Sequence, residues 1–329
     1  QPRLAAAEAA AEAARRPQHA HGRRKSSDEQ SAEVVGSSAW AAVAGRLLSI
    51  LPNHLGVDWT QCTAGYWQRG RWSSAIVGFQ DTQSVSLDDL LHVDAQKAAL
   101  FTNTQQLLAD LPANNALLWG ARGTGKSSLV HGVLAAFADQ GLRLVEVGKE
   151  ALVDLAEVIE SLADQPYRFI VFCDDLSFED DDASYKSLKS VLEGSVLARA
   201  SNVVIYATSN RRHLLAEKNS DNAASGLVDG ELHHGEAVEE KISLSDRFGL
   251  WLSFYPVRQN EYLDMVRSAI DRLVHQYASA QTLRDEFSPD YYRQEALRWA
   301  LARGVRNGRS AEHFARHWVG QQLLKQSST

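Results

Sequence analysis

Cysteine is scarce in this sequence: Cys62 and Cys173 are the only two cysteines in 329 residues. They lie far apart and lack the paired spacing of a zinc site, and Cys173 lies in an apolar run that we expect to be buried. This scarcity excludes a disulfide framework and favours a reducing compartment. We therefore expect a cytoplasmic protein.

Long hydrophobic runs are also missing, because no stretch approaches the roughly 18 consecutive apolar residues of a membrane helix. The N-terminus lacks the pattern of a secretory signal. Basic residues are not in excess either, since 34 Lys and Arg face 41 Asp and Glu, for a net charge of −7. Chains that coat nucleic acid are usually basic. We expect no membrane association and no surface built as a whole for nucleic acid.

Hydrophobic residues make up 44% of the chain, enough for an ordinary folded core. Short apolar runs alternate with helical patterns, which predicts a parallel sheet covered by helices on both faces. The expected strands are residues 116–119, 142–147, 167–173, 202–208 and 250–255, and the expected helices are residues 87–111, 126–139, 149–164, 184–199, 261–277, 291–303 and 310–324. We therefore expect an α/β core over residues 86–257 and a small helical domain over residues 258–329.

The N-terminal part of the chain has a different character. Residues 1–36 combine an alanine-rich stretch, a basic cluster and a polar run, which predicts a disordered tail; a basic arm for a polyanion or a transit peptide is the alternative. Residues 37–85 are rich in Trp and Tyr, so we expect an N-terminal subdomain of unknown role in which these side chains pack or, alternatively, dock a partner. The long polar segment 214–242 predicts a functional or mobile loop.

The strongest motif is the octapeptide Gly-Ala-Arg-Gly-Thr-Gly-Lys-Ser, between an expected strand and an expected helix. Its glycines let backbone N–H groups converge on phosphate oxygens, and the helix directs its positive end to the same place. Lys126 would reach the β- and γ-phosphates, and the Ser127 hydroxyl would ligate Mg²⁺. The sequence therefore predicts a P-loop, or Walker A motif, that binds ATP and Mg²⁺. The expected nucleotide-binding residues are Gly120, Ala121, Arg122, Gly123, Thr124, Gly125, Lys126, Ser127 and Ser128.

Asp174 and Asp175 end an apolar strand, at the edge where parallel sheets bind ligands. This position predicts a Walker B motif in which Asp174 and Ser127 hold Mg²⁺. Asp175 is expected to polarise the attacking water, a role more often given to the longer Glu. The acids at residues 179–182 fit a helix start instead.

Further polar residues follow the same edge. Asn210 ends the next strand and is expected to orient water, although a turn residue is the alternative. Arg247 precedes the last strand and is expected to act as an arginine finger in a neighbouring subunit; a surface ion pair is the alternative. Arg303, Arg306 and Arg309 cluster before the last helix, and we select Arg306 as the one that reaches the phosphates. The catalytic candidates are Lys126, Asp175, Asn210 and Arg247.

With these motifs in place, residues 86–325 resemble the AAA+ superfamily. More narrowly, the strings at residues 112–115, 118–128, 174–179, 208–213 and 243–250 resemble the bacterial AAA+ family called domain of unknown function 815. The resemblance implies a P-loop NTPase core with a five-stranded parallel sheet in the order 5-1-4-3-2 and a helical lid. It also implies an Asp in the place of the catalytic Glu. Residues 306–309 read Arg-Asn-Gly-Arg, where the resemblance implies Arg-Ser-Gly-Arg.

The resulting hypothesis is an AAA+ ATPase that hydrolyses ATP to ADP and phosphate to switch or remodel a macromolecular partner, protein or nucleic acid. It is expected to form a homo-oligomer in which Arg247 acts in trans. Two alternatives stay open: a nucleotide-gated binding protein with little hydrolysis, and a P-loop kinase for small molecules. Adenine is the expected base, because the Asn-Lys-X-Asp string of GTPases is missing.

Overall fold

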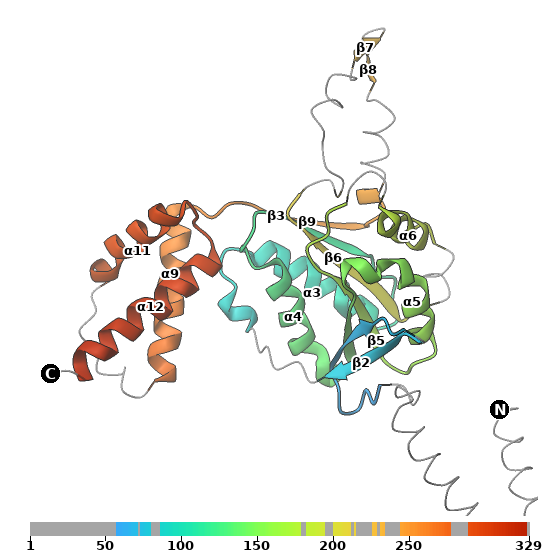
Figure 1. Ribbon diagram of the computed structural model, residues 1–329, viewed down its shortest axis with the longest axis horizontal. Coiled ribbons are helices and arrows are strands. Elements are labelled where there is room, and N and C mark those ends of the chain that lie inside the picture. Colours follow the sequence, from blue (N-terminus) through green and yellow to red (C-terminus); the bar gives the residue numbers. More distant parts are fainter. Residues whose placement is uncertain are drawn as a thin grey trace, which may run out of the picture. The chain divides into compact units, whose positions relative to one another are not determined.

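The computed structural model describes most of the chain from residue 57 onward (Figure 1). The described residues are 57–71, 73–79, 86–178, 182–194, 200–211, 214, 226–228, 231–233, 244–277 and 289–327. The tail expected at residues 1–36, the first part of the aromatic segment and most of the polar segment 214–242 lie outside them.

A mostly parallel sheet forms the centre of the core. Its strand order is β2-β1-β4-β5-β6-β3-β9. The strands are β1 (Ala64–Gln68), β2 (Ala75–Phe79), β3 (Ala116–Gly120), β4 (Leu142–Glu146), β5 (Arg168–Cys173), β6 (Val203–Ser209) and β9 (Leu250–Phe254). The five core strands β3, β4, β5, β6 and β9 run parallel to one another. If they are numbered 1 to 5 along the chain, their order in the sheet is 5-1-4-3-2, which confirms the expected order.

The expected count of five strands is wrong, because β1 and β2 extend the sheet to seven. β1 runs parallel to β4, and β2 pairs with β1 in the antiparallel direction. Trp67 of β1 is buried and donates its indole N–H to Asp154 at 3.1 Å, which fixes the added strands to the core. Their short runs include Gly and polar residues, so their pattern does not distinguish them from loops. The described part of residues 37–85 is thus continuous with the sheet.

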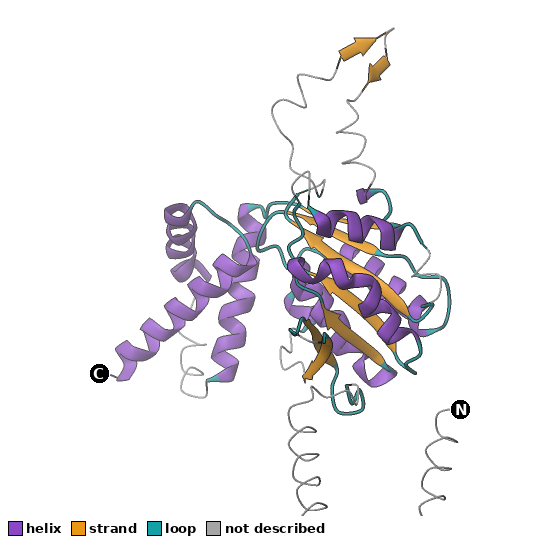
Figure 2. Ribbon diagram, turned by 45° about the vertical axis from the view of Figure 1, so that its right-hand side comes forward, coloured by secondary structure: helices purple, strands orange, loops and turns teal. Residues whose placement is uncertain are grey.

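Two hydrophobic layers cover the faces of the sheet, because side chains alternate along the buried strands. On β5, Phe169, Val171 and Cys173 face one layer, whereas Ile170 and Phe172 face the other. Helices enclose the core strands on both faces (Figure 2), as parallel strands require.

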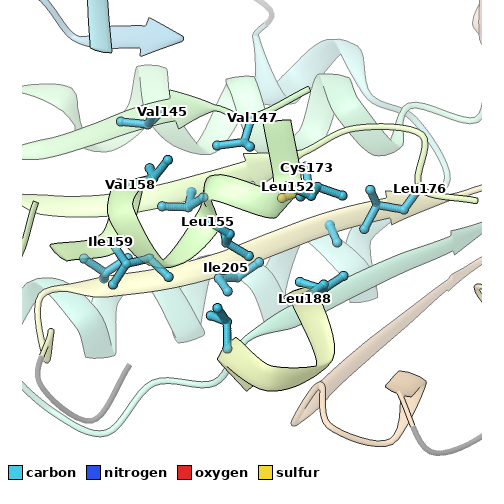
Figure 3. Close-up of a cluster of buried hydrophobic side chains, with 14 of the residues drawn as sticks. Val145, Val147, Leu152, Leu155, Val158, Ile159, Cys173, Leu176, Leu188 and Ile205 are labelled. Atoms are coloured by element: carbon cyan, nitrogen blue, oxygen red, sulfur yellow. The ribbon is translucent and has the colours of Figure 1, made fainter. Parts of the chain in front are cut away.

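The first layer is formed by helices that follow the second and third core strands. They are η3 (Lys149–Asp154), α5 (Leu155–Ala163) and α6 (Ala183–Leu192). In Figure 3, Leu155 and Ile159 of α5 and Leu188 of α6 gather with Ile205 of β6 in this layer. Each such buried aliphatic side chain contributes about 1.5–3 kcal/mol.

The second layer lies beneath the helices that flank the P-loop in sequence. They are η1 (Leu87–Asp89), α3 (Asp94–Leu108), α4 (Lys126–Phe137) and η2 (Ala138–Gln140). Leu129 and Val133 of α4 pack there against Leu118 of β3 and Tyr206 of β6. A rigid strand and a rigid helix therefore hold the two ends of the P-loop.

The C-terminal helices have a hydrophobic core of their own. They are α9 (Gln259–Gln276), α11 (Pro289–Arg303) and α12 (Gly308–Ser327), which confirms the three expected helices. Tyr262, Val266 and Ile270 of α9 pack with Phe314 and Trp318 of α12. Among the described residues, no helix combines the length and apolarity needed to cross a membrane.

A second, two-stranded sheet lies within the long polar segment. It pairs β7 (Gly226–Val228) with β8 (Glu231–His233) in the antiparallel direction. The sequence between them is Asp-Gly, a dipeptide that favours tight hairpin turns. This local signal was present in a segment that we expected to lack regular structure.

Candidate functional site

The P-loop joins the end of β3 to the start of α4. Gly120, Gly123 and Gly125 have φ angles of 131°, 73° and 94°, in the region that favours glycine. A Cβ atom at Gly120 would lie 2.0 Å from the carbonyl oxygen of Phe254, so only glycine fits beside β9. The loop therefore adopts a compact backbone turn at the N-terminal end of a helix, where anions bind.

Lys126 begins α4 and turns back across this loop. The residue is 7% exposed. Its Nζ atom donates to the carbonyl oxygens of Gly120 and Ala121, both at 2.8 Å, and to Oδ1 of Asn210 at 3.2 Å. Burial lowers the pKa of Lys126 below its usual value, and the carboxylates of Asp175 and Asp174 oppose that shift. The ammonium group thus lies at the centre of the site.

Asp174 lies beside Ser127, as the Walker B interpretation requires. The Ser127 hydroxyl donates to Oδ1 of Asp174 at 2.6 Å, and the Thr208 hydroxyl donates to the same oxygen at 2.6 Å. A hydroxyl and a carboxylate oxygen are ligands that suit Mg²⁺, which takes few protein ligands when phosphates supply the rest. The residues present therefore fit this metal ion.

Asp175 has an unusual backbone conformation, with φ at 50°. A non-glycine residue in this region costs on the order of 1–3 kcal/mol, and such residues cluster at functional sites. Its N–H group donates to Oγ1 of Thr208 at 2.9 Å, and its carboxylate accepts a short hydrogen bond from the Asn210 amide. Asn210 therefore links Lys126 to Asp175.

These groups line one cleft of about 820 Å³ between the sheet edge and the lid helices. The lining includes residues 122–128, both aspartates, Thr208 and Asn210. From the lid come side chains of α9 and α12, including Arg272, Arg309 and Arg316. Sequence reasoning assigned no role to Thr208 or Arg272: Thr208 stands in the string at residues 208–213, where only Asn210 was selected, and Arg272 belongs to no motif string.

The lid arginine that lines the cleft is not the one selected from the sequence. Arg309 lines the cleft, whereas Arg306 is absent from the described lining and exposed. The reason is that α12 begins at Gly308, so Arg309 lies in its first turn and Arg306 precedes it. In the structure, Arg309 rather than the expected Arg306 thus lies at the cleft.

Side-chain contacts join the lid to the core at this cleft. Arg272 of α9 pairs with Asp89 of η1 at 2.7 Å and also with Glu312 of α12. His92 pairs with Asp264 at 3.2 Å. These contacts hold α9 and α12 against the segment before α3.

Arg247 lies apart from the other candidates. Its guanidinium pairs with Glu193 at the end of α6, and Arg247 is not among the described residues that line the cleft. The side chain remains 26% exposed. Within the subunit, Arg247 therefore forms a surface ion pair with Glu193.

Three solved structures are similar to this chain at low sequence identity. RuvB of Thermotoga maritima, described as a Holliday junction branch migration motor, is 11% identical, with 70% of this chain and 71% of that chain covered and a TM-score of 0.38. ORC1 of Aeropyrum pernix, solved in complex with DNA, is 16% identical, with coverages of 73% and 68% and a TM-score of 0.41. PCH-2 of C. elegans is 18% identical, with coverages of 57% and 50% and a TM-score of 0.36.

No curated protein matches the chain. A family model described as "Protein of unknown function (DUF815)" matches residues 60–322. Together with the sheet order and the P-loop between β3 and α4, this match confirms the resemblance drawn from the motif strings. The chain belongs to the DUF815 family, with the fold class of an AAA+ P-loop ATPase.

Proposed function

We propose that this chain hydrolyses ATP to ADP and phosphate and uses the energy to switch or remodel a macromolecular partner. One observation carries the proposal: Asn210 joins Lys126 of the P-loop to Asp175, while Asp174 lies against Ser127. A phosphate-binding cation, a metal-binding pair and a carboxylate that can orient water are therefore within one cleft.

Binding is assigned to the P-loop. Backbone N–H groups of residues 122–127 would contact the phosphates, and Lys126 would exchange its carbonyl partners for phosphate oxygens. Ser127 and Asp174 would hold Mg²⁺, which neutralises charge on the phosphates when bound. Leu90, Leu91 and Met265 line the same cleft and offer apolar surface for a base.

Hydrolysis is assigned to Asp175 and Asn210. Water attacks the γ-phosphorus, the bond to the β-γ bridging oxygen breaks, and ADP leaves with that electron pair. Asp175 orients the water and accepts its proton, while Asn210 holds the Asp175 carboxylate in place. The positive φ of Asp175 supports this assignment, because non-glycine residues in this conformation cluster at functional sites.

The proposal includes a homo-oligomer in which Arg247 of one subunit completes the site of the next. Two observations support it: the exposure of Arg247 and its position outside the cleft of its own subunit. Its pair with Glu193 is no obstacle, since an exposed ion pair contributes only about 0–1 kcal/mol. Binding to a neighbour's phosphate would compensate for its loss.

The two alternative functions differ from ATP hydrolysis in what they release. A nucleotide-gated binding protein would bind ATP without release of phosphate, and the short carboxylate of Asp175 is the observation that favours it. A small-molecule kinase would form ADP without free phosphate; Arg309 and Arg316 in the cleft are the observation that favours it.

The test measures ADP and phosphate separately after incubation with ATP and Mg²⁺. An ATPase releases both in equal amounts, and Lys126→Ala should abolish both by loss of the phosphate contact. Lys325→Ala, at the far end of α12, is the matched control and should behave as wild type. The incubation is repeated with a panel of small-molecule hydroxyl acceptors; ADP without phosphate in their presence would establish a kinase, because the phosphoryl group then ends on the acceptor. Tight ATP binding without ADP or phosphate would establish the binding protein.

A further inference from the structure

Two hydrogen bonds tie the start of the lid helix α12 directly to the backbone of the P-loop. The Gly308 N–H donates to the carbonyl oxygen of Gly123 at 3.0 Å. The Asn307 side-chain amide donates to the carbonyl oxygen of Arg122 at 2.9 Å. These contacts join the P-loop to the lid string at residues 306–309, and no role has been assigned to Asn307 or Gly308 above.

The side-chain amide of Asn307 makes two hydrogen bonds, one to its own helix and one to the P-loop. Its Oδ1 atom accepts from the Ser310 N–H at 2.8 Å and so caps α12. Its Nδ2 atom donates to the P-loop carbonyl. The partners fix this orientation, because a backbone N–H needs an acceptor and a carbonyl oxygen needs a donor. An Asp at this position could cap α12 but could not donate to the P-loop carbonyl, since an ionised carboxylate has no hydrogen to donate.

The close approach depends on Gly123. A Cβ atom there would lie 2.5 Å from Nδ2 of Asn307, and the φ angle of 73° already favours glycine. Gly123 therefore lets the P-loop curl and lets the lid touch it.

The two hydrogen bonds from the lid also orient the peptide groups of the P-loop. The described part of the chain has no cis peptide bond. In a trans peptide the C=O and the next N–H point in opposite directions. When the lid holds the oxygens of Arg122 and Gly123, it therefore directs the N–H groups of Gly123 and Thr124 away from itself. A hydrogen bond to a carbonyl also polarises the N–H of the same peptide.

The same contact sets the position of the lid arginine. Arg309 follows Asn307 by two residues, in the first turn of α12, and lines the cleft. Anchoring of the helix start to the P-loop therefore fixes where its guanidinium can reach.

We propose that Asn307 and Gly308 form a clamp through which the lid orients two phosphate-binding N–H groups and holds Arg309 at the nucleotide cleft. They are positioning residues, and the clamp couples occupancy of the P-loop to the lid. The effect on nucleotide rests on the proposed function, whereas the clamp itself exists in the protein alone.

The test uses variants that separate the clamp from the helix cap. Asn307→Asp keeps the cap and removes the donor, whereas Asn307→Ala removes both. Gly308→Pro removes the other donor at the first helical position, where proline is tolerated. Gly308→Ala is compared with it because alanine keeps the N–H, although its Cβ would lie 3.3 Å from the Gly123 carbonyl oxygen and shift that oxygen slightly. Two quantities are measured on the whole chain: hydrogen exchange of the peptide containing residues 120–128, and the release rate of a fluorescent ATP analogue.

We expect Asn307→Asp to keep the melting temperature of the wild type while exchange in the P-loop rises and the analogue leaves about tenfold faster, a change of about 1.4 kcal/mol. Gly308→Pro should act in the same direction, and Gly308→Ala should have a smaller effect because it keeps the donor. Wild-type exchange and release in Asn307→Asp would overturn the proposal, as would effects seen only in variants with a lowered melting temperature. If the wild-type chain binds no analogue, the proposed function fails, and the exchange data alone decide on the clamp.

Discussion

A single hydroxyl group contacts both aspartates of the site. Thr208 is buried on β6; its Oγ1 donates to Asp174 at 2.6 Å and accepts from the N–H of Asp175 at 2.9 Å. It therefore orients the proposed metal ligand and supports the strained backbone of the proposed catalytic residue at once. This double contact follows from the pairing of neighbouring strand ends, β5 and β6.

Replacement of this hydroxyl should therefore affect stability and chemistry together. Thr208→Val keeps the shape of the side chain but leaves the Asp175 N–H without an acceptor. We expect the free energy of unfolding to fall by about 1–3 kcal/mol, as measured by urea denaturation. Phosphate release should fall at least about tenfold, since each 1.4 kcal/mol of lost transition-state stabilisation is a factor of ten. Thr208→Ser keeps the hydroxyl and is the control; equal activities of the two variants would refute this role.

At the scale of elements, the strands with dense apolar runs were predictable and the others were not. β5 reads Arg-Phe-Ile-Val-Phe-Cys, a pattern that parallel strands buried on both faces require. β1 reads Ala-Gly-Tyr-Trp-Gln, and its place in the sheet depends on packing against β4 and on the bond from Trp67 to Asp154. Such long-range contacts leave no periodic signal in the sequence.

The residues of the candidate site were also predictable only in part. The P-loop residues are contiguous, so their backbone role follows from residue type and order. Asn210 and Asp175 could be placed at neighbouring strand ends by the rule for parallel sheets. The choice between Arg306 and Arg309 depends on where α12 begins and how it meets the P-loop, which is a tertiary contact.

The two arginines provide a matched pair for experiment. We expect Arg309→Ala to weaken ATP binding about tenfold or more, because a charge-assisted contact contributes about 1.5–3 kcal/mol. Arg306→Ala should leave the affinity within about twofold, because a surface contact outside the cleft contributes little. Equilibrium titration with a fluorescent ATP analogue measures both. The reverse order of effects would restore Arg306 as the nucleotide-binding residue.

For the whole molecule, the proposal requires that sites be completed between subunits. Arg247 belongs to the turn before β9 and is held by Glu193, outside the cleft of its own subunit. If this guanidinium acts on a neighbour, activity must depend on assembly. Two defective subunits must then be able to complement each other.

The complementation experiment combines Arg247→Ala with Asp175→Asn. Arg247→Ala alone should lower phosphate release by about a thousandfold, the effect of a lost arginine finger, whereas Arg267→Ala on the lid surface should not. A mixture of the two inactive variants should regain part of the wild-type rate, because Arg247 of the Asp175→Asn subunit can serve the intact site of its neighbour. Failure of any mixture to exceed the separate rates would leave Arg247 as a surface ion pair.

The most direct test of the central claim, that this cleft hydrolyses ATP, is single-turnover phosphate release by Asp175→Asn. The variant keeps the P-loop, the metal ligands and the shape of residue 175, so ATP should bind with nearly wild-type affinity. The account predicts that phosphate release falls about a hundredfold or more, because the group that activates water is lost. Release at the wild-type rate by this variant would contradict the account.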